Sequence, residues 1–317
     1  MMETVTCCVC NRPVGGNAPH LGTRAYCPEH WANLNRNRGS TWRSGLLSVV
    51  ALTIYAVIAA WLLRVWHPTL SDVGLIVAGA VLALVPALVW LAFFYLQDRL
   101  EPEPKGYVFG VFVLGALLAG AVGIPVVRDL FRVQDWLGNS LLFNLLGSIL
   151  VVGFVQSFLV YAAVRYSIYL STEFDERFDG ILYGTAAGLG FATVLNLNFV
   201  VASGGVNLSM AVIQSVIVAL VHASFGGVLG YFLGRAKFEE EPVWWLSAGL
   251  VLVATLNGLF TVAWDAVVRS GSVLSGQTVN PWLGLVLAVL VAGATFGALI
   301  VLMRRANRLT LAGADVP

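Results

Sequence analysis

The sequence predicts an all-α integral membrane protein with about eight transmembrane helices, preceded by a small zinc-ribbon-like cytosolic domain. Hydrophobic residues make up 58% of the chain and charged residues only 11%, whereas soluble proteins carry about 25% charged residues. The apolar residues gather in long runs, and all four cysteines lie before them, between Cys7 and Cys27. A net charge of +1 gives no reason to expect a nucleic-acid partner.

The N-terminal cysteines have the spacing of a metal site. Cys7 and Cys10 form a C-x-x-C pair, and Cys27 and His30 form a C-x-x-H pair after sixteen intervening residues. Three thiolates and one imidazole complete a closed tetrahedral set, which predicts a structural zinc ion in a reducing compartment. We expect Cys8 to be a spectator, with His20 as a possible substitute ligand. No position is left open for catalysis, so the pattern favours a fold-holding or partner-binding module.

Eight apolar segments follow, and each is long enough to cross a hydrocarbon core, which needs about 20 residues. We place them near residues 46–66, 73–96, 107–127, 141–170, 180–202, 208–233, 243–268 and 282–303. The predicted domains are a zinc-binding domain and basic linker at 1–43, a transmembrane domain at 44–310 and a C-terminal tail at 311–317.

Basic residues predict the orientation in the bilayer. Most arginines and lysines fall at the N-terminus, the C-terminus and the loops on their side, while Arg64, Arg128, Arg132 and Arg269 fall on the other side. By the positive-inside rule, both termini are cytosolic and the protein is a multi-pass protein of the cytoplasmic (plasma) membrane. Acidic residues share the cytosolic loops, for which we favour salt-bridged surfaces over a cation site.

Small residues recur every four positions in two of the segments, from Gly180 to Asn196 and from His222 to Gly234. Such spacing lets helix backbones approach closely in lipid. An antiparallel pair would bring Gly180 to the level of Gly234 and Asn196 to the level of His222.

Polar side chains deep in the spans are few, and they usually mark function or interhelical hydrogen bonds. They occur on four consecutive spans, as Gln156 and Ser157, Asn196, His222, and Asn257. Their similar depth predicts one inward-facing cluster. Its only acid or base is His222, because an amide or a hydroxyl does not abstract a proton at neutral pH.

Several ordered motifs resemble the PrsW family of bacterial intramembrane proteases, which are related to CAAX-processing membrane proteases. The first is the acidic run at 98–105, which is similar to the family's D-R-x-E-P-E-P-x loop. Further blocks lie at 173–176, 178–184, 187–193, 222–223 and 230–237. The N-terminal cysteine motifs lie outside the resemblance.

The resemblance implies a site with a Glu-Glu-x-x-Lys motif on one helix, Glu-Asn on the next and a histidine on each of the two after that. Such a site would activate water against a peptide bond, with a metal. Carried onto this chain, most of the pattern is replaced. The matching positions hold Gln156, Ser157, Val160, Leu195, Asn196, His222 and Asn257, so only Asn196 and His222 are retained.

We therefore predict a PrsW-like pseudoprotease that is catalytically inactive and holds no metal in the membrane. Its vestigial site comprises Gln156, Ser157, Leu195, Asn196, His222 and Asn257. It would bind a transmembrane protein partner in the bilayer and regulate it. An alternative is an active, atypical intramembrane peptidase that cleaves a transmembrane substrate such as an anti-sigma factor, with zinc in the membrane site or with Ser157 and His222 as a dyad. A third hypothesis is a transporter-like membrane protein, for which the cluster holds too few charges.

Overall fold

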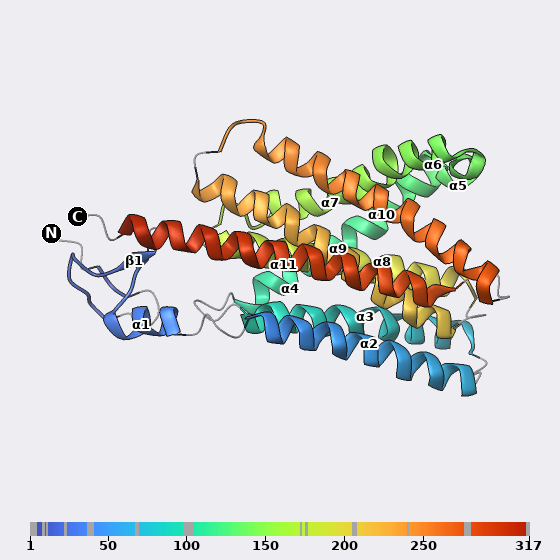
Figure 1. Ribbon diagram of the computed structural model, residues 1–317, viewed down its shortest axis with the longest axis horizontal. Helices are drawn as coiled ribbons and strands as arrows, with labels where there is room; N and C mark the ends of the chain where they lie inside the picture. Colours follow the sequence, from blue (N-terminus) through green and yellow to red (C-terminus); the bar gives the residue numbers. More distant parts are fainter. Residues whose placement is uncertain are drawn as a thin grey trace.

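The computed structural model describes residues 5–7, 10, 12–21, 24–36, 41–66, 70–97, 104–171, 173–174, 177–204, 208–239, 241–275 and 280–314. The chain begins with a small module at one end of a long helical bundle (Figure 1). Two short antiparallel strands, β1 (His20–Leu21) and β2 (Arg24–Ala25), precede α1 (Pro28–Arg36). Strand β1 contacts the C-terminal helix of the bundle, and both termini lie at this end. We call it the termini end, and the opposite end of the bundle the far end.

Eight helical segments in the described residues are long and apolar enough to cross a membrane, which confirms the predicted fold class. A helix satisfies its own backbone hydrogen bonds, so it is one of the few structures that lipid tolerates. The spans comprise α2 (Thr41–Trp66); α3 (Asp72–Gln97); α4 (Lys105–Leu118) with η1 (Ala119–Gly123), η2 (Pro125–Leu130), α5 (Val133–Trp136) and η3 (Leu137–Asn139); α6 (Leu141–Gly147) with η4 (Ser148–Gly153) and α7 (Phe154–Arg165); α8 (Arg177–Ala202); α9 (Leu208–Phe238); α10 (Trp245–Ser275); and α11 (Pro281–Ala314).

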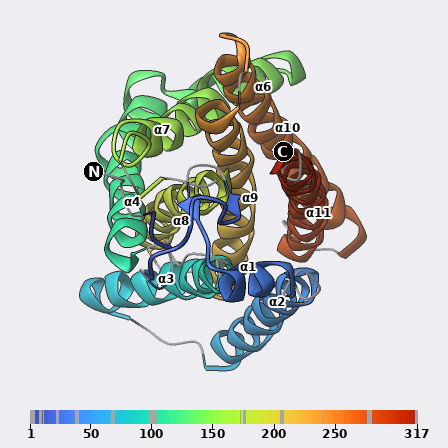
Figure 2. The same ribbon diagram turned by 90° about the vertical axis from the view of Figure 1, so that its left-hand side faces the viewer.

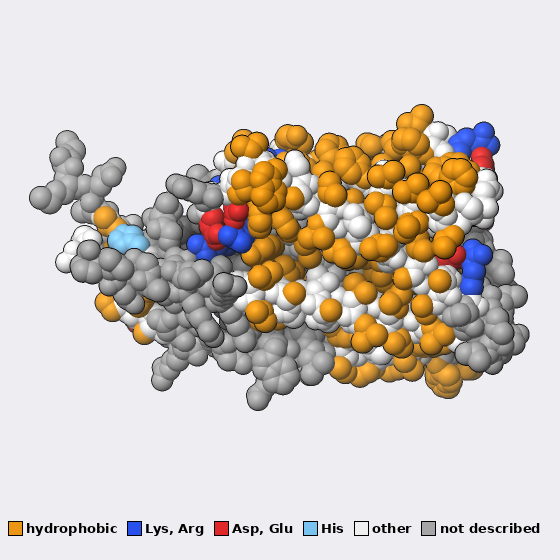
Figure 3. Space-filling model, turned by 45° about the horizontal axis from the view of Figure 1, so that its top comes forward, with side chains coloured by type: hydrophobic (Ala, Val, Ile, Leu, Met, Phe, Trp, Pro, Cys, Tyr) orange, Lys and Arg blue, Asp and Glu red, His pale blue; other side chains and the backbone are white. Residues whose placement is uncertain are grey.

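Helices α8 and α9 form the centre of the bundle, and the other spans surround them (Figure 2). The buried share is 83% for the α9 span and 56% for the α8 span, against 17% to 33% for the others. The outer spans instead present apolar side chains outwards, and hydrophobic atoms cover most of the body in Figure 3, with charged side chains gathered at its two ends. This surface suits a bilayer, so the chain is a multi-pass membrane protein.

The central helices run antiparallel with their backbones in close contact. A Cβ atom at Gly184 would lie 2.2 Å from the carbonyl oxygen of Gly226, and one at Gly188 would lie 2.3 Å from that of His222. The two small-residue stripes therefore pack against each other as predicted. A Cβ atom at Gly180 would lie 2.8 Å from the backbone nitrogen of Gly234, its predicted neighbour, and 2.2 Å from the carbonyl oxygen of Gly230. The predicted level of Asn196 is wrong, because its Nδ2 donates to the carbonyl oxygen of Ser215 at 3.1 Å, about two turns from His222.

Charged residues at the termini end pair with one another. Glu239 contacts Arg177 at 3.1 Å and Arg235 at 2.5 Å, and Arg235 also contacts Glu241 at 2.5 Å. These contacts agree with the predicted salt-bridged surface. Lys237 Nζ donates to the backbone carbonyl oxygens of Tyr169, Ser171 and Phe174. These hydrogen bonds hold the turn after α7 against the end of α9. The family-like motif at 98–103 and residues 175–176 lie outside the described residues.

Candidate functional site

The predicted metal ligands come together in the N-terminal module. The ligand atoms of Cys7, Cys10, Cys27 and His30 all lie within 4.8 Å of one another. Cys27 Sγ lies 3.0 Å from His30 Nδ1 and 4.0 Å from Cys10 Sγ, while tetrahedral zinc sets two sulfur ligands about 3.8 Å apart. This Cys₃His group could hold a metal ion. That the ion is zinc stays a prediction, and Cys8 lies outside the described residues.

The short elements of the module explain how two distant sequence pairs meet. Strands β1 and β2 pair His20 with Ala25, which reverses the chain just before Cys27. Helix α1 then begins at Pro28, and its first turn carries His30. Cys7 is fully buried and Cys27 is 7% exposed, so the donor atoms face inwards in a module with little apolar core. His20 is not among the four grouped residues.

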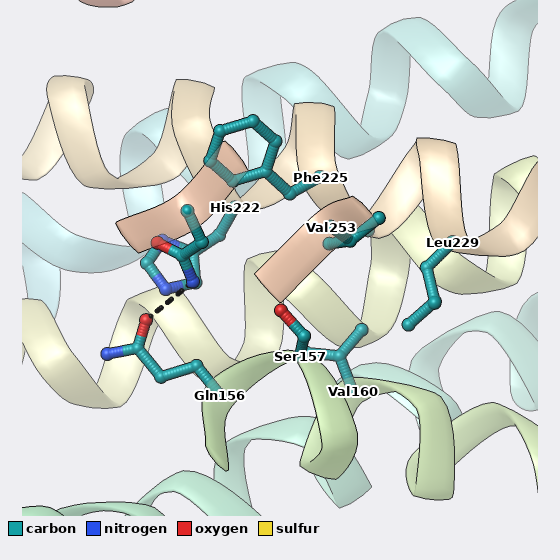
Figure 4. Close-up of a pocket in the computed structure, with 9 residues that line it drawn as sticks. Gln156, Ser157, Val160, His222, Phe225, Leu229 and Val253 are labelled. Carbon is teal, nitrogen blue, oxygen red and sulfur yellow. Dashed lines mark hydrogen bonds between the residues drawn. The ribbon is translucent and has the colours of Figure 1, made fainter. Parts of the chain in front are cut away.

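The membrane site is a small cavity between α7, α9 and α10, which we call the site cavity (Figure 4). Its volume is about 10 Å³, room for no more than one water molecule. Its polar walls come from four predicted residues, and its apolar walls come from Val160, Phe225, Leu229 and Val253, together with Gly226. The four polar residues are Gln156, Ser157, His222 and Asn257.

His222 is held in one orientation from its own helix. Its Nδ1 lies 3.0 Å from the carbonyl oxygen of Val218, and because a carbonyl only accepts, Nδ1 carries the hydrogen. The other ring nitrogen, Nε2, is buried and has no hydrogen-bond partner among the described residues. The ring of Phe191 stacks on the imidazole, with centroids 5.8 Å apart and planes 12° apart. A metal-ligating histidine is oriented in the same way, with its second nitrogen donating to a carbonyl.

Gln156 and Asn257 bind each other across the cavity. Asn257 Nδ2 donates to Gln156 Oε1 at 2.9 Å, which joins α7 to α10 (Figure 4). The two helices meet closely here, because a Cβ at Gly153 would lie 2.2 Å from the carbonyl oxygen of Ala254. The π-helical turn η4 ends at Gly153, just before Gln156, and such turns occur often at functional sites.

The other predicted site residues differ in whether they line a cavity. Ser157 is 4% exposed, and its buried hydroxyl has no hydrogen-bond partner among the described residues. Leu195 lines a second, larger cavity that also reaches Gln156. Asn196 lines neither cavity and is bound to the backbone of α9. Phe191 and Asn198, on the same side of α8 as Leu195, also line the second cavity; their spacing from Leu195 is the sequence signal that could have found them.

Comparison with known proteins identifies the scaffold that carries this site. Residues 103–295 match the model of the PrsW family intramembrane metalloproteases. The chain belongs to the PrsW family. Protease PrsW of Halalkalibacterium halodurans is 32% identical over 179 residues, or 56% of this chain and 79% of that relative. Protease PrsW of Bacillus subtilis is 30% identical over 179 residues, with 56% of this chain and 78% of the relative covered. No solved structure matches.

The PrsW family name implies a metal, and the donors around the site cavity do not fit one. Catalytic zinc takes about three nitrogen, sulfur or carboxylate ligands from the protein. Among the residues that line the site cavity, His222 alone offers an imidazole, through its buried Nε2, and none is acidic or a cysteine. The amides of Gln156 and Asn257 are occupied with each other. The N-terminal Cys₃His group lies outside the family match, so it does not supply the missing ligands.

Proposed function

We propose that this PrsW-family protein has lost peptidase activity and binds a transmembrane protein partner as a regulatory pseudoprotease. The observation that carries the proposal is the hydrogen bond between Gln156 and Asn257. The family resemblance puts a glutamate and a histidine at these two positions. Two neutral amides replace a base and a ligand, and their mutual hydrogen bond occupies both.

Hydrolysis of a peptide bond needs a water molecule activated by a base or a metal. Ser157 and Leu195 stand where the resemblance puts two further carboxylates, and neither ionises at neutral pH. His222 remains oriented by Val218, and its Nε2 is buried without a hydrogen-bond partner among the described residues. A single imidazole with no carboxylate beside it lacks the partner that sets up a general base or a metal site.

The parts of a PrsW-like scaffold that serve binding are present. The outer spans present apolar side chains to the bilayer, and the second, larger cavity gives a membrane partner a place to pack. In this proposal the module at 1–43 binds a structural zinc and provides a fold anchor or second contact, the transmembrane domain covers 44–310, and 311–317 is a tail. The basic residues at the termini end put both termini in the cytosol of a bacterial cell.

One observation favours an alternative, a peptidase that uses Ser157 as nucleophile and His222 as base. Both have a buried polar atom without a hydrogen-bond partner among the described residues, and both line the site cavity. A working dyad has the nucleophile hydrogen-bonded to the base and a third group orienting the base. No such bond joins Ser157 to His222 in the described structure, and the orienting group is the Val218 carbonyl. We therefore favour the inactive protein.

The test is cleavage of single-pass membrane substrates by the purified full-length protein in proteoliposomes. We expect no cleavage, and the same result for His222→Ala. An active PrsW relative in the same vesicles is the positive control. Cleavage that His222→Ala abolishes would overturn the proposal, and Ser157→Ala would then tell a dyad from a metal site. Metal analysis of a Cys7→Ser and Cys27→Ser variant reports separately on the membrane site, where we expect none.

A further inference from the structure

A second cavity of about 180 Å³ lies towards the far end of the bundle, and we call it the far-end cavity. It sits between α8, the π-helical part of the third span and the start of α7. Its volume is that of about six water molecules, far more than the site cavity offers. Its lining residues are Gly123, Ile124, Val127, Arg128, Gln156, Phe191, Leu195 and Asn198.

The far-end cavity lies between Arg128 at the far end of the bundle and Gln156, a residue that it shares with the vestigial site. Phe191, Leu195 and Asn198 follow one side of α8, so this wall runs about 10 Å along the helix axis. At its inner end lies Gln156, which also lines the site cavity, and Phe191, which stacks on His222. At its outer end lies Arg128, whose side chain is 57% exposed.

The polar groups of the cavity match those of an unwound peptide. Asn198 carries an amide, which offers both a donor and an acceptor, as a peptide bond does. Gln156 accepts from Asn257 through Oε1 and keeps its Nε2 as a donor. The side chain of Asn198 makes no hydrogen bond in the part of the chain that the structure describes. A membrane segment that leaves the helical conformation must find partners for its peptide groups, because lipid offers none. The apolar walls leave room for a large aliphatic side chain.

Arg128, at the outer end of the far-end cavity, adds a preference for a negatively charged group. Its Nε lies 3.0 Å from Asp129, and both side chains are more than half exposed, so this pair contributes little and is easily exchanged. The two terminal nitrogens make no hydrogen bond or ion pair with another described residue. A guanidinium fork can bind a carboxylate through both of them. The neighbouring Arg132 pairs with Asp135 at 2.8 Å and does not line the cavity.

We propose that the far-end cavity receives an extended segment of the membrane partner, and that Arg128 selects partners with a carboxylate at that membrane face. The proposal rests on the binding function proposed above and names the chemistry of the partner. A lipid phosphate would also satisfy Arg128. Phosphate and ester oxygens only accept hydrogen bonds, so a lipid would match the two amides of the cavity less well than a peptide does.

The test uses full-length protein in nanodiscs of zwitterionic phosphatidylcholine. The probes are fluorescent Leu/Ala-rich peptides with one span of about 22 residues, a Gly–Pro break near the far face, and Asp, Asn or Lys just beyond it. We expect the Asp peptide to bind about tenfold more tightly than the Lys peptide, the scale of one charge-assisted hydrogen bond. Arg128→Gln should remove the difference, and Arg132→Gln, the matched control, should keep it. Arg128→Glu should reverse the preference, a gain of binding that misfolding does not produce.

The other outcomes overturn the proposal in distinguishable ways. Equal binding of all three peptides, unchanged by Arg128→Gln, would refute selection by Arg128 and leave the binding function standing. Absence of binding by every peptide would overturn both. An effect of Arg128→Gln that appears only with anionic phosphatidylglycerol, and equally for every peptide, would assign Arg128 to a lipid phosphate instead.

Discussion

Replacing Gly184 by alanine tests the packing on which the whole bundle depends. The new methyl group would lie 2.2 Å from the carbonyl oxygen of Gly226, whereas a carbon and a carbonyl oxygen in contact are about 3.3 Å or more apart. The two central helices would therefore have to separate by about 1 Å. Helix α9 has little freedom to move, because 83% of its span is buried by the surrounding helices.

The matched control is Gly110→Ala on α4, where a Cβ atom would meet no atom within 4 Å. Overpacking a well-packed core costs about 1–3 kcal/mol, and alanine in an open helical position gains up to about 1 kcal/mol over glycine. Both variants share this gain, so we expect them to differ by the overpacking cost, about 2 kcal/mol, with Gly184→Ala the less stable. At about 2–4 °C per kcal/mol, their melting temperatures should differ by roughly 4–8 °C.

The assay is thermal unfolding of each full-length variant in the same detergent, followed by size-exclusion chromatography of a fluorescent fusion. Gly188→Ala should behave like Gly184→Ala, because its methyl group would meet the carbonyl oxygen of His222 at 2.3 Å. Equal melting temperatures for Gly184→Ala and Gly110→Ala would refute the close antiparallel contact between α8 and α9. They would also refute the position of His222 that this contact sets.

Three further predictions concern other parts of the chain. Gln156→Leu and Asn257→Leu should each destabilise the protein by about 1 kcal/mol, and the double variant by less than their sum, as a double-mutant cycle of unfolding would measure; additive losses would contradict the hydrogen bond. Cys27→Ser should lose bound metal in elemental analysis, and acid should release metal from the wild type because the ligands bind deprotonated; full retention would contradict the site. Lys237→Met should speed hydrogen exchange in the turn after α7, which loses its carbonyl contacts to α9; unchanged exchange would show that the turn holds by itself.

Most of the fold follows from two simple sequence signals. Apolar runs of sufficient length give the eight spans, and the four-residue stripes give the α8–α9 pair. What they do not determine is register. Asn196 lies opposite Ser215 and away from His222, because the stripes contain several equivalent small residues and a shift between them costs little. The π-helical turns beside the cavities also escaped prediction, since no residue pattern in these apolar runs marks them.

The sequence predicts most of the polar residues of the site, but it does not predict the cavities that they line. Polar side chains in lipid are rare, which is why Gln156, Ser157, His222 and Asn257 stand out in the sequence, and all four line one cavity. The far-end cavity was not predicted. Its walls are mostly ordinary apolar residues, and Phe191 on its inner wall gives no chemical signal. A cavity depends on the packing between helices, which composition does not encode.

The amide pair explains how the proposed loss of ligands at this site would be compensated. A buried site that once held charged ligands leaves polar groups without partners when single residues change, and in a bilayer each such group is costly. Gln156 and Asn257 avoid that cost because each has the shape to reach the other and neither carries a charge. Gly153 keeps α10 close enough for the bond to form. In the proposed pseudoprotease, this arrangement would need no metal and would keep the cavities for a partner that is bound without being cleaved.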